Sequence, residues 1–268
     1  MGRLKSSVDI IGTQELKTVG LYKALVAEFL GTLILVLFGC ASTLGETTDV
    51  VKVSLTFGFT LACLIQALDH VSGCHVNPSV TLGMLVARYM SVTRSVLYII
   101  VQTLGGVAGA AILYGITPEE NRFGMGVSHL NPNMSEAQGF GVEVLCTFML
   151  VLVIFGSTDE RRTDIRGSIA LAIGLAAVCT HLFGIPYTGA SLNPARTFGP
   201  ALIVGGDAWA HHWVYWAGPI SGGILASLVY LHVFRGTDVP QKNTQTLPVS
   251  VPLIPITNKE LKNLEMES

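Results

Sequence analysis

Six long apolar runs recur along this chain of 268 residues, and they limit its fold more than any other feature. Each run approaches the roughly 20 residues that an α-helix needs to cross the hydrocarbon of a bilayer. Only 13% of the residues are charged, whereas an average soluble domain carries about 25%. The pattern predicts an all-α integral membrane protein with spans at Ala24–Leu44, Val50–Leu68, Ser95–Ile116, Gln138–Ser157, Ser168–Ile185 and His212–Phe234.

The positions of Lys and Arg predict how the chain crosses the membrane. Cytosolic segments retain positive charge. If both ends are cytosolic, all but three of the 16 basic residues lie on that side. Residues 1–20 lack the apolar core of a secretory signal peptide. We therefore expect cytosolic tails at 1–20 and 237–268, and the second tail, polar with scattered prolines, is expected to be disordered.

An internal repeat relates residues 21–118 to residues 136–235. When residues 72–83 are aligned with residues 188–199, five positions of the twelve are identical, whereas unrelated segments would match at about one. Each copy holds three spans, and because three is odd, the second copy enters the membrane from the opposite side. Such inverted 3+3 repeats place their functional site near the midplane, where the copies meet. The identical pairs are Gly73/Gly189, Asn77/Asn193, Pro78/Pro194, Thr81/Thr197 and Gly83/Gly199.

Each copy contains an Asn-Pro pair followed by an apolar stretch that is too short to cross hydrocarbon, Ser79–Val86 and Ala195–Val204. Asn is a good N-cap and Pro suits the first turn, so each pair predicts the start of a re-entrant half-helix. Irregular backbone at membrane depth must line a cavity or be buried in protein. Side-chain N–H groups of Asn77 and Asn193 could orient a passing molecule, and the two helix N-termini would repel cations. The alternative is that both asparagines only cap helices.

The segments SGCHVNPSVTLG, YTGASLNPARTFG and AEFLGT, together with the repeat, resemble the aquaporin, or major intrinsic protein, family over about residues 20–236. The resemblance implies an hourglass pore of six transmembrane helices and two half-helices, and a homotetramer. We expect the protein to lie in the plasma membrane. Ser79 departs from the usual Asn-Pro-Ala, a small-for-small change. The implied pore centre consists of Asn77, Pro78, Ser79, Asn193, Pro194 and Ala195.

Arg196 aligns with Val80, which makes it the strong electrostatic difference between the two half-helices. An ionisable residue in a membrane is expected to face a cavity or a partner, and a snorkelling interfacial arginine is the alternative. The resemblance implies that Arg196 joins Phe57, His181 and Ala190 in the narrow filter of water-selective members. Glycerol-conducting relatives usually have Asp after Asn-Pro-Ala-Arg and Gly at the histidine position. Without the resemblance, a core histidine and a lipid-facing phenylalanine would be preferred.

Further polar residues fall at or beside the matched positions. Glu28 and Glu143 correspond in the two copies, and we expect them to accept hydrogen bonds from the re-entrant loops, with a proton relay as the alternative. Cys74 and His75 precede the first Asn-Pro and are candidates for lining the pore. A mercurial site at the cysteine and pH gating at the histidine stay open, as does glycosylation of Asn133 in its Asn-Met-Ser sequon.

The expected function is a passive, osmotically driven water channel that excludes protons and ions. The sequence shows no phosphate-binding loop, metal-spaced Cys/His set or nucleophile triad, so no enzyme activity, cofactor or metal is expected. A net charge of −2 provides no basic surface for nucleic acid. A channel for glycerol or other small solutes, and a junction or adhesion protein with a vestigial pore, are the alternatives. The glycines of 105–109 and 222–223 predict close helix contacts.

Overall fold

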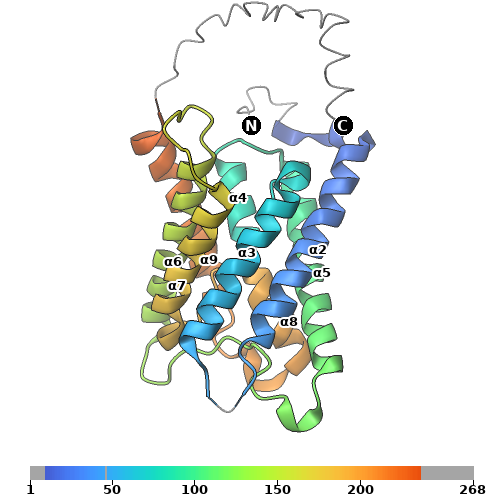
Figure 1. Ribbon diagram of the computed structural model, residues 1–268, viewed down its shortest axis with the longest axis vertical. Helices are drawn as coiled ribbons and strands as arrows, with labels where there is room; N and C mark the ends of the chain where they lie inside the picture. Colours follow the sequence, from blue (N-terminus) through green and yellow to red (C-terminus); the bar gives the residue numbers. More distant parts are fainter. Residues whose placement is uncertain (1–9, 46, 237–268) are drawn as a thin grey trace, which may run out of the picture. The chain divides into compact units, whose positions relative to one another are not determined.

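A computed structural model describes residues 10–45 and 47–236, so the predicted tail 237–268 lies outside the described residues. Six segments are long and apolar enough to cross a membrane, which confirms the predicted spans (Figure 1). Within the described residues, two shorter α-helices lie between them. The membrane-spanning segments are α2 (Val19–Ala41), α3 (Val50–Ser72), α5 (Val92–Ile116), α6 (Glu136–Thr158), α7 (Ile169–Thr188) and Gly206–Phe234, which holds η3 (Gly206–Trp209), α9 (Val214–Val229) and the π-helix η4 (Tyr230–Phe234).

Local capping moves the helix ends away from the limits of the apolar runs. α2 begins at Val19, before the predicted Ala24, because the side chain of Thr18 accepts a hydrogen bond from a first-turn N–H. The same helix ends at Ala41 instead of Leu44. Short 3₁₀ helices, η1 (Thr13–Lys17) and η2 (Glu119–Asn121), lie before α2 and after α5.

Two half-helices enter the bundle from opposite ends, α4 (Pro78–Val86) in the upper half of Figure 1 and α8 (Pro194–Val204) in the lower half. Each begins at a proline, where the missing N–H would have no partner within the helix. The preceding asparagine caps each helix, since Oδ1 of Asn77 and of Asn193 accepts a hydrogen bond from the N–H two residues later, at 2.8 and 3.0 Å. The predicted inverted arrangement is therefore present in the fold.

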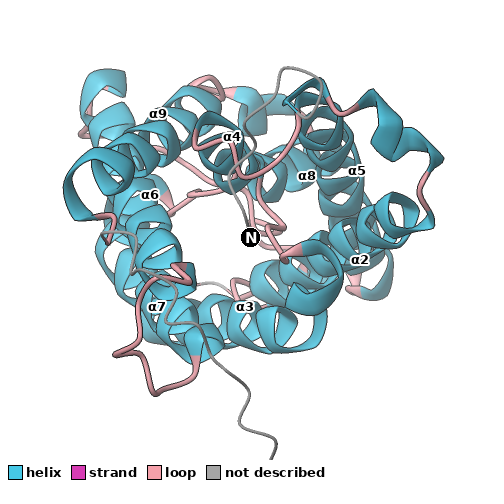
Figure 2. Ribbon diagram, turned by 90° about the horizontal axis from the view of Figure 1, so that it is seen from above, coloured by secondary structure: helices cyan, strands magenta, loops and turns pink. Residues whose placement is uncertain are grey.

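Helices from the two copies surround the centre of the bundle (Figure 2). α2 packs against α5 and α6 packs against α9, which are equivalent pairs, while α3 packs against α7 where the copies meet. Glycines allow these close approaches: a Cβ at Gly105 or Gly109 would lie 2.4 Å from a carbonyl oxygen of α2, and one at Gly222 would lie 2.4 Å from a carbonyl oxygen of α6. The predicted glycine contacts are confirmed.

The first turn of each half-helix packs on the last long helix of the other copy. A Cβ at Gly106 of α5 would lie 2.3 Å from the carbonyl oxygen of Ala195, and one at Gly223 of α9 would lie 2.6 Å from that of Ser79. Real Cβ atoms essentially never come within 3.0 Å of such an atom. Only glycine fits at these two positions, and the contacts set the depth at which the half-helices meet.

Candidate functional site

The carboxylate of Glu28 holds the first re-entrant loop from behind. It is fully buried and accepts hydrogen bonds from the Ser72 hydroxyl at 2.7 Å, from the His75 N–H at 2.9 Å and from the Val76 N–H at 2.7 Å. The Gln102 amide donates a further bond at 2.8 Å. An acceptor-only group suits a loop whose N–H groups cannot pair within a helix.

Glu143 makes the equivalent contacts in the second copy. Its buried carboxylate accepts hydrogen bonds from the Thr188 hydroxyl at 2.6 Å, the Ser191 N–H at 2.9 Å and the Leu192 N–H at 2.8 Å. Both glutamates were expected to accept hydrogen bonds from the re-entrant loops, and their role as loop braces stays a prediction. The extra partner of Glu28, Gln102, was not anticipated; a glutamine within an apolar span was the available signal.

Both loops contain two residues other than glycine in the left-handed region of backbone space. The φ angles are +44° for Cys74, +45° for Val76, +52° for Ala190 and +53° for Leu192. This region is costly for residues with a Cβ and most costly for a β-branched one such as Val76. The hydrogen bonds to the two glutamates stabilise this backbone, which leaves the carbonyl groups of the loops outside any helix.

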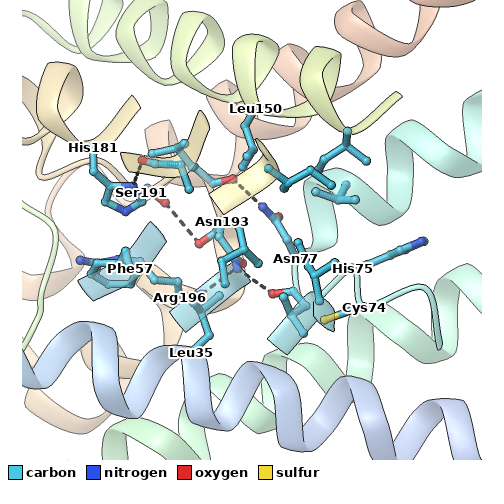
Figure 3. A pocket seen from close by; sticks show the side chains of 18 residues that line it. Leu35, Phe57, Cys74, His75, Asn77, Leu150, His181, Ser191, Asn193 and Arg196 are labelled. Atoms are coloured by element: carbon cyan, nitrogen blue, oxygen red, sulfur yellow. Dashed lines mark hydrogen bonds between the residues drawn. The ribbon is translucent and has the colours of Figure 1, made fainter. Parts of the chain in front are cut away.

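The two asparagines bind the loop of the opposite copy (Figure 3). Nδ2 of Asn77 donates to the Leu192 carbonyl at 2.9 Å, and Nδ2 of Asn193 donates to the Val76 carbonyl at 2.7 Å. Each side-chain oxygen is already engaged as a helix cap. Since an amide nitrogen carries two hydrogens, one N–H remains on each asparagine for a molecule in the cavity.

A narrow cavity runs past these asparagines and encloses about 40 Å³ of space for the centres of water molecules. One water needs roughly 10–15 Å³ by this measure, so only a few waters fit. Polar groups occur at a few points of an otherwise apolar wall. The lining includes Phe57, Cys74, His75, Asn77, His181, Asn193 and Arg196, together with aliphatic side chains such as Leu35, Leu61, Ile65, Leu150 and Ile173.

Several candidate residues do not belong to this lining. Pro78, Ser79, Pro194 and Ala195 are buried in the first turns of the half-helices, behind the asparagines. Ala190 is fully buried and also does not line the cavity. All five side chains are small or cyclic, and glycines of the other copy closely approach the carbonyl oxygens of Ser79 and Ala195.

Three side chains lie together in the lining of the cavity, and we expect them to form its narrowest point, called the constriction below. The rings of Phe57 and His181 are stacked with their centroids 4.6 Å apart, and Cζ of Arg196 lies 5.0 Å from the centroid of the Phe57 ring. A Cβ at Gly39 would lie 2.2 Å from that ring, so this glycine makes room for it. The three residues come from α3, α7 and α8.

Hydrogen bonds set which atoms of the constriction face the cavity. Nδ1 of His181 lies 2.8 Å from the Ala177 carbonyl, which can only accept, so the proton is on Nδ1 and Nε2 of the neutral ring is an acceptor. This Nε2 and Nε of Arg196 are buried and have no hydrogen-bond partner within the described residues. Unpaired buried polar atoms are costly, so both are suited to bind a small polar permeant.

The loop that contains Gly126 and Ser128, for which the sequence predicts no role, holds Arg196. Its Nη1 donates to the Gly126 carbonyl at 2.6 Å and to the Ser128 hydroxyl at 2.9 Å. Gly124 and Gly126 have φ angles of +62° and +77°, and this closely spaced glycine pair was the available sequence signal. These two hydrogen bonds hold the guanidinium beside the Phe57 ring.

A wider cavity of about 1040 Å³ adjoins the narrow one and contains the other two candidates. Cys74 and His75 line both cavities, so they lie where the pore opens into a vestibule. Nδ1 of His75 is 3.1 Å from the Thr81 hydroxyl. The wall of this vestibule also includes the ends of α3 and α6 and the connection to α7.

Comparisons with known proteins agree with this architecture. The profile of the family described as Major intrinsic protein matches residues 15–230. The chain is 49% identical to Aquaporin-4 of Mus musculus over 224 residues, covering 81% of this chain and 69% of that protein. It is 45% identical to the Lens fiber major intrinsic protein of Lithobates pipiens, covering 81% and 82%. The X-ray structure of the aquaglyceroporin from Plasmodium falciparum superimposes with a TM-score of 0.72 at 26% identity, covering 80% and 96%.

Proposed function

We propose, from the premise that this chain belongs to the major intrinsic protein family, that it is a passive, osmotically driven water channel. Water moves in either direction through the narrow cavity, and the protein consumes no energy source. It is a multi-pass membrane protein, and its relatives include the Aquaporin-4 proteins.

The observation that carries this proposal is the constriction of Phe57, His181 and Arg196. The stacked rings leave little width, and the free Nε2 of the histidine and Nε of the arginine offer one acceptor and one donor. A water molecule entering there exchanges its hydrogen bonds with other waters for bonds with these two atoms. A glycerol molecule is wider and would need more contacts than the constriction provides, so glycerol is excluded.

Proton exclusion arises at the centre, where the two half-helices begin. Each helix N-terminus contributes roughly half a positive charge, which disfavours hydronium and other cations, as is general for aquaporin-type pores. The one free N–H on each of Asn77 and Asn193 donates to the oxygen of the same water. Its hydrogens then point away from the centre on both sides, so proton transfer along the water file is interrupted.

Placement in the cell and assembly belong to the same proposal. We place both termini in the cytosol of cells that carry the protein in the plasma membrane, because all but three of the 16 basic residues then face the cytosol. The described residues nearest the two ends lie at the same end of the bundle in Figure 1. We propose that the protein assembles as a homotetramer with one pore per chain. The molar mass of the purified protein in detergent, corrected for bound detergent, should then equal that of four chains.

The decisive experiment is stopped-flow light scattering of proteoliposomes, with water and glycerol permeability measured on one preparation. The blocked variant is His181→Trp, and its matched control is Leu182→Trp, since this neighbouring side chain is 42% exposed on the outer surface of the same helix. The proposal is supported if the unaltered protein and Leu182→Trp conduct water fast while glycerol permeability stays at the level of empty vesicles. His181→Trp should then lose the fast water flux. Fast glycerol flux selects the solute-channel alternative, and no flux of either by inserted protein selects the junction alternative.

A further inference from the structure

A short segment before the first membrane helix is docked on the bundle. The N-terminal strap, residues 11–17, contacts the start of α5: the Thr93 hydroxyl donates to the Ile11 carbonyl at 2.7 Å, and Nε of Arg94 pairs with Oε2 of Glu15 at 2.5 Å. A Cβ at Gly12, whose φ is +74°, would lie 2.3 Å from the side chain that caps α5. The strap is held by three separate contacts to one helix end.

A buried tyrosine connects this helix end to the first re-entrant loop. Nη1 of Arg94 is 3.5 Å from the Tyr98 hydroxyl, and its guanidinium carbon is 5.9 Å from the ring centroid. Tyr98 is fully buried, and its hydroxyl donates to the Ser72 carbonyl at 2.8 Å. Its ring also meets His75 edge to face, with the centroids 5.5 Å apart. Ser72 and His75 are two of the residues that donate hydrogen bonds to Glu28.

The residues at the end of this chain of contacts form the inner mouth of the pore. Arg94, Ser72 and His75 all line the wide vestibule, and His75 also lines the narrow cavity. The salt bridge itself is partly accessible, since the side chains of Arg94 and Glu15 are 22% and 27% exposed. A group that water can reach is thus connected to the loop backbone through one buried hydroxyl.

The second copy has an equivalent pair without this connection. Gly106 of α5 and Gly223 of α9 make equivalent contacts with the two half-helices, and when α5 is aligned with α9 at these glycines, Arg94 corresponds to His211 and Tyr98 to Tyr215. Nδ1 of His211 pairs with Oε1 of Glu136 at 2.5 Å, much as Arg94 pairs with its glutamate. The Tyr215 hydroxyl, however, is buried and has no hydrogen-bond partner within the described residues. Of these two equivalent arrangements, only that of the first copy reaches its loop.

We propose that the strap, Arg94 and Tyr98 act as a relay that positions the first re-entrant loop, so that undocking of the strap loosens the inner mouth of the pore. Arg94 and Tyr98 are positioning residues, since they act through the loop backbone. The positioning of the loop is independent of what permeates, whereas the effect on water flux rests on the proposed function.

The test is amide hydrogen exchange of the intact protein in proteoliposomes, read by mass spectrometry for residues 72–77. The variants are Glu15→Gln and Tyr98→Phe, with Tyr215→Phe as the matched control. One hydrogen bond to the loop is removed in Tyr98→Phe, so exchange there should become about two- to tenfold faster. Residues 188–193 of the other loop serve as an internal reference and should be unchanged.

Three outcomes decide the proposal. Faster exchange of residues 72–77 in both variants, with no change in Tyr215→Phe, supports the relay. Exchange equal to that of the unaltered protein in both variants overturns it, and so does equal acceleration of both loops, which would indicate general loosening. If Tyr98→Phe does not insert, Glu15→Gln at the accessible pair carries the test alone. Absence of water flux in the unaltered protein would refute the proposed function and leave the exchange result valid.

Discussion

Replacing Gly106 by alanine should displace the half-helix α8 from the centre of the pore. The added Cβ would lie 2.3 Å from the Ala195 carbonyl oxygen, while real contacts of this kind are not shorter than 3.0 Å. The two helices must therefore separate by about 0.7 Å, the difference of these distances. A Cβ at Gly199 of α8 would meet the Gly106 carbonyl at 2.3 Å, so the two backbones already touch from both sides and cannot slide past each other.

The matched control is Gly115→Ala on the same helix, where nothing lies within 4 Å of the added atom. Both variants gain about 1 kcal/mol of helix propensity. Only Gly106→Ala has the overpacking cost of about 1–3 kcal/mol. The difference corresponds to a melting temperature lower by about 2–12 °C than that of the control. Gly223→Ala, with a starting distance of 2.6 Å, should fall between the two.

The assays are thermal unfolding in detergent and water permeability of proteoliposomes for the three glycine variants. We expect the order of both stability and flux to follow the distances, with Gly106→Ala lowest. Displacement of Ala195 by this distance would also move the side-chain amide of Asn193, which donates a hydrogen bond to the loop of the other copy. If Gly106→Ala unfolds at the temperature of Gly115→Ala and conducts water normally, the close contact does not position α8.

Three other changes test separate parts of the site. Glu143→Gln replaces an acceptor by an amide that leaves a buried loop N–H unpaired, so the free energy of unfolding should fall by about 1–3 kcal/mol, and an unchanged denaturation midpoint would contradict the bracing role. Ser128→Ala removes one of two partners of Arg196 Nη1 and should raise glycerol permeability relative to water, while an unchanged ratio would show that the loop does not hold the filter. Burial alone would raise the pKa of Asp159, but hydrogen bonds from the Arg161 N–H and a tyrosine hydroxyl, with the charge of the arginine, lower it. Its contribution to stability is present above the ordinary value of 3.8 and is lost as pH falls through the lower folded-state pKa, so thermal unfolding of Asp159→Asn should depend less on acid pH than that of the unaltered protein.

The membrane spans could be predicted because the thickness of hydrocarbon sets the length of an apolar helix. The ends could not, since they depend on single contacts. Thr18 extends α2 toward the N-terminus by accepting one N–H, and the last span leaves α-helical geometry at Tyr230, where a π-helix begins. Neither feature changes the apolar pattern from which the spans were predicted.

At the centre of the site, the residues that occur at matching positions in both copies could be identified from the sequence. Glu28 and Glu143 stood out because both copies keep them, and their roles and those of the asparagines stay predictions. The cross-bonds could not be predicted, because Asn77 and Asn193 bind the main-chain carbonyls of Leu192 and Val76, and a carbonyl carries no sequence signature.

The residues of the constriction could not be identified from the repeat. Phe57 and His181 are ordinary residues of apolar helices, and only the resemblance to a known family joined them to Arg196. Ser128 lies in a loop without any repeated motif, so its bond to Arg196 became visible only in the structure.

The reciprocal asparagine bonds also have a consequence for biosynthesis. They join residues 115 and 117 positions apart, so neither re-entrant loop has its partner until the ribosome has delivered the other. In a nascent chain halted before residue 188, Glu28 can already hold the N–H groups of His75 and Val76, but the bond from Asn193 to the Val76 carbonyl is missing. We therefore expect amide exchange of residues 72–77 to be faster in this arrested chain than in the full chain. Closure on release of the full chain would establish that the two halves are completed together, and a protected loop in the arrested chain would show that the first half matures alone. If the two halves are completed together, a partly synthesised chain has no finished pore through which water could leak.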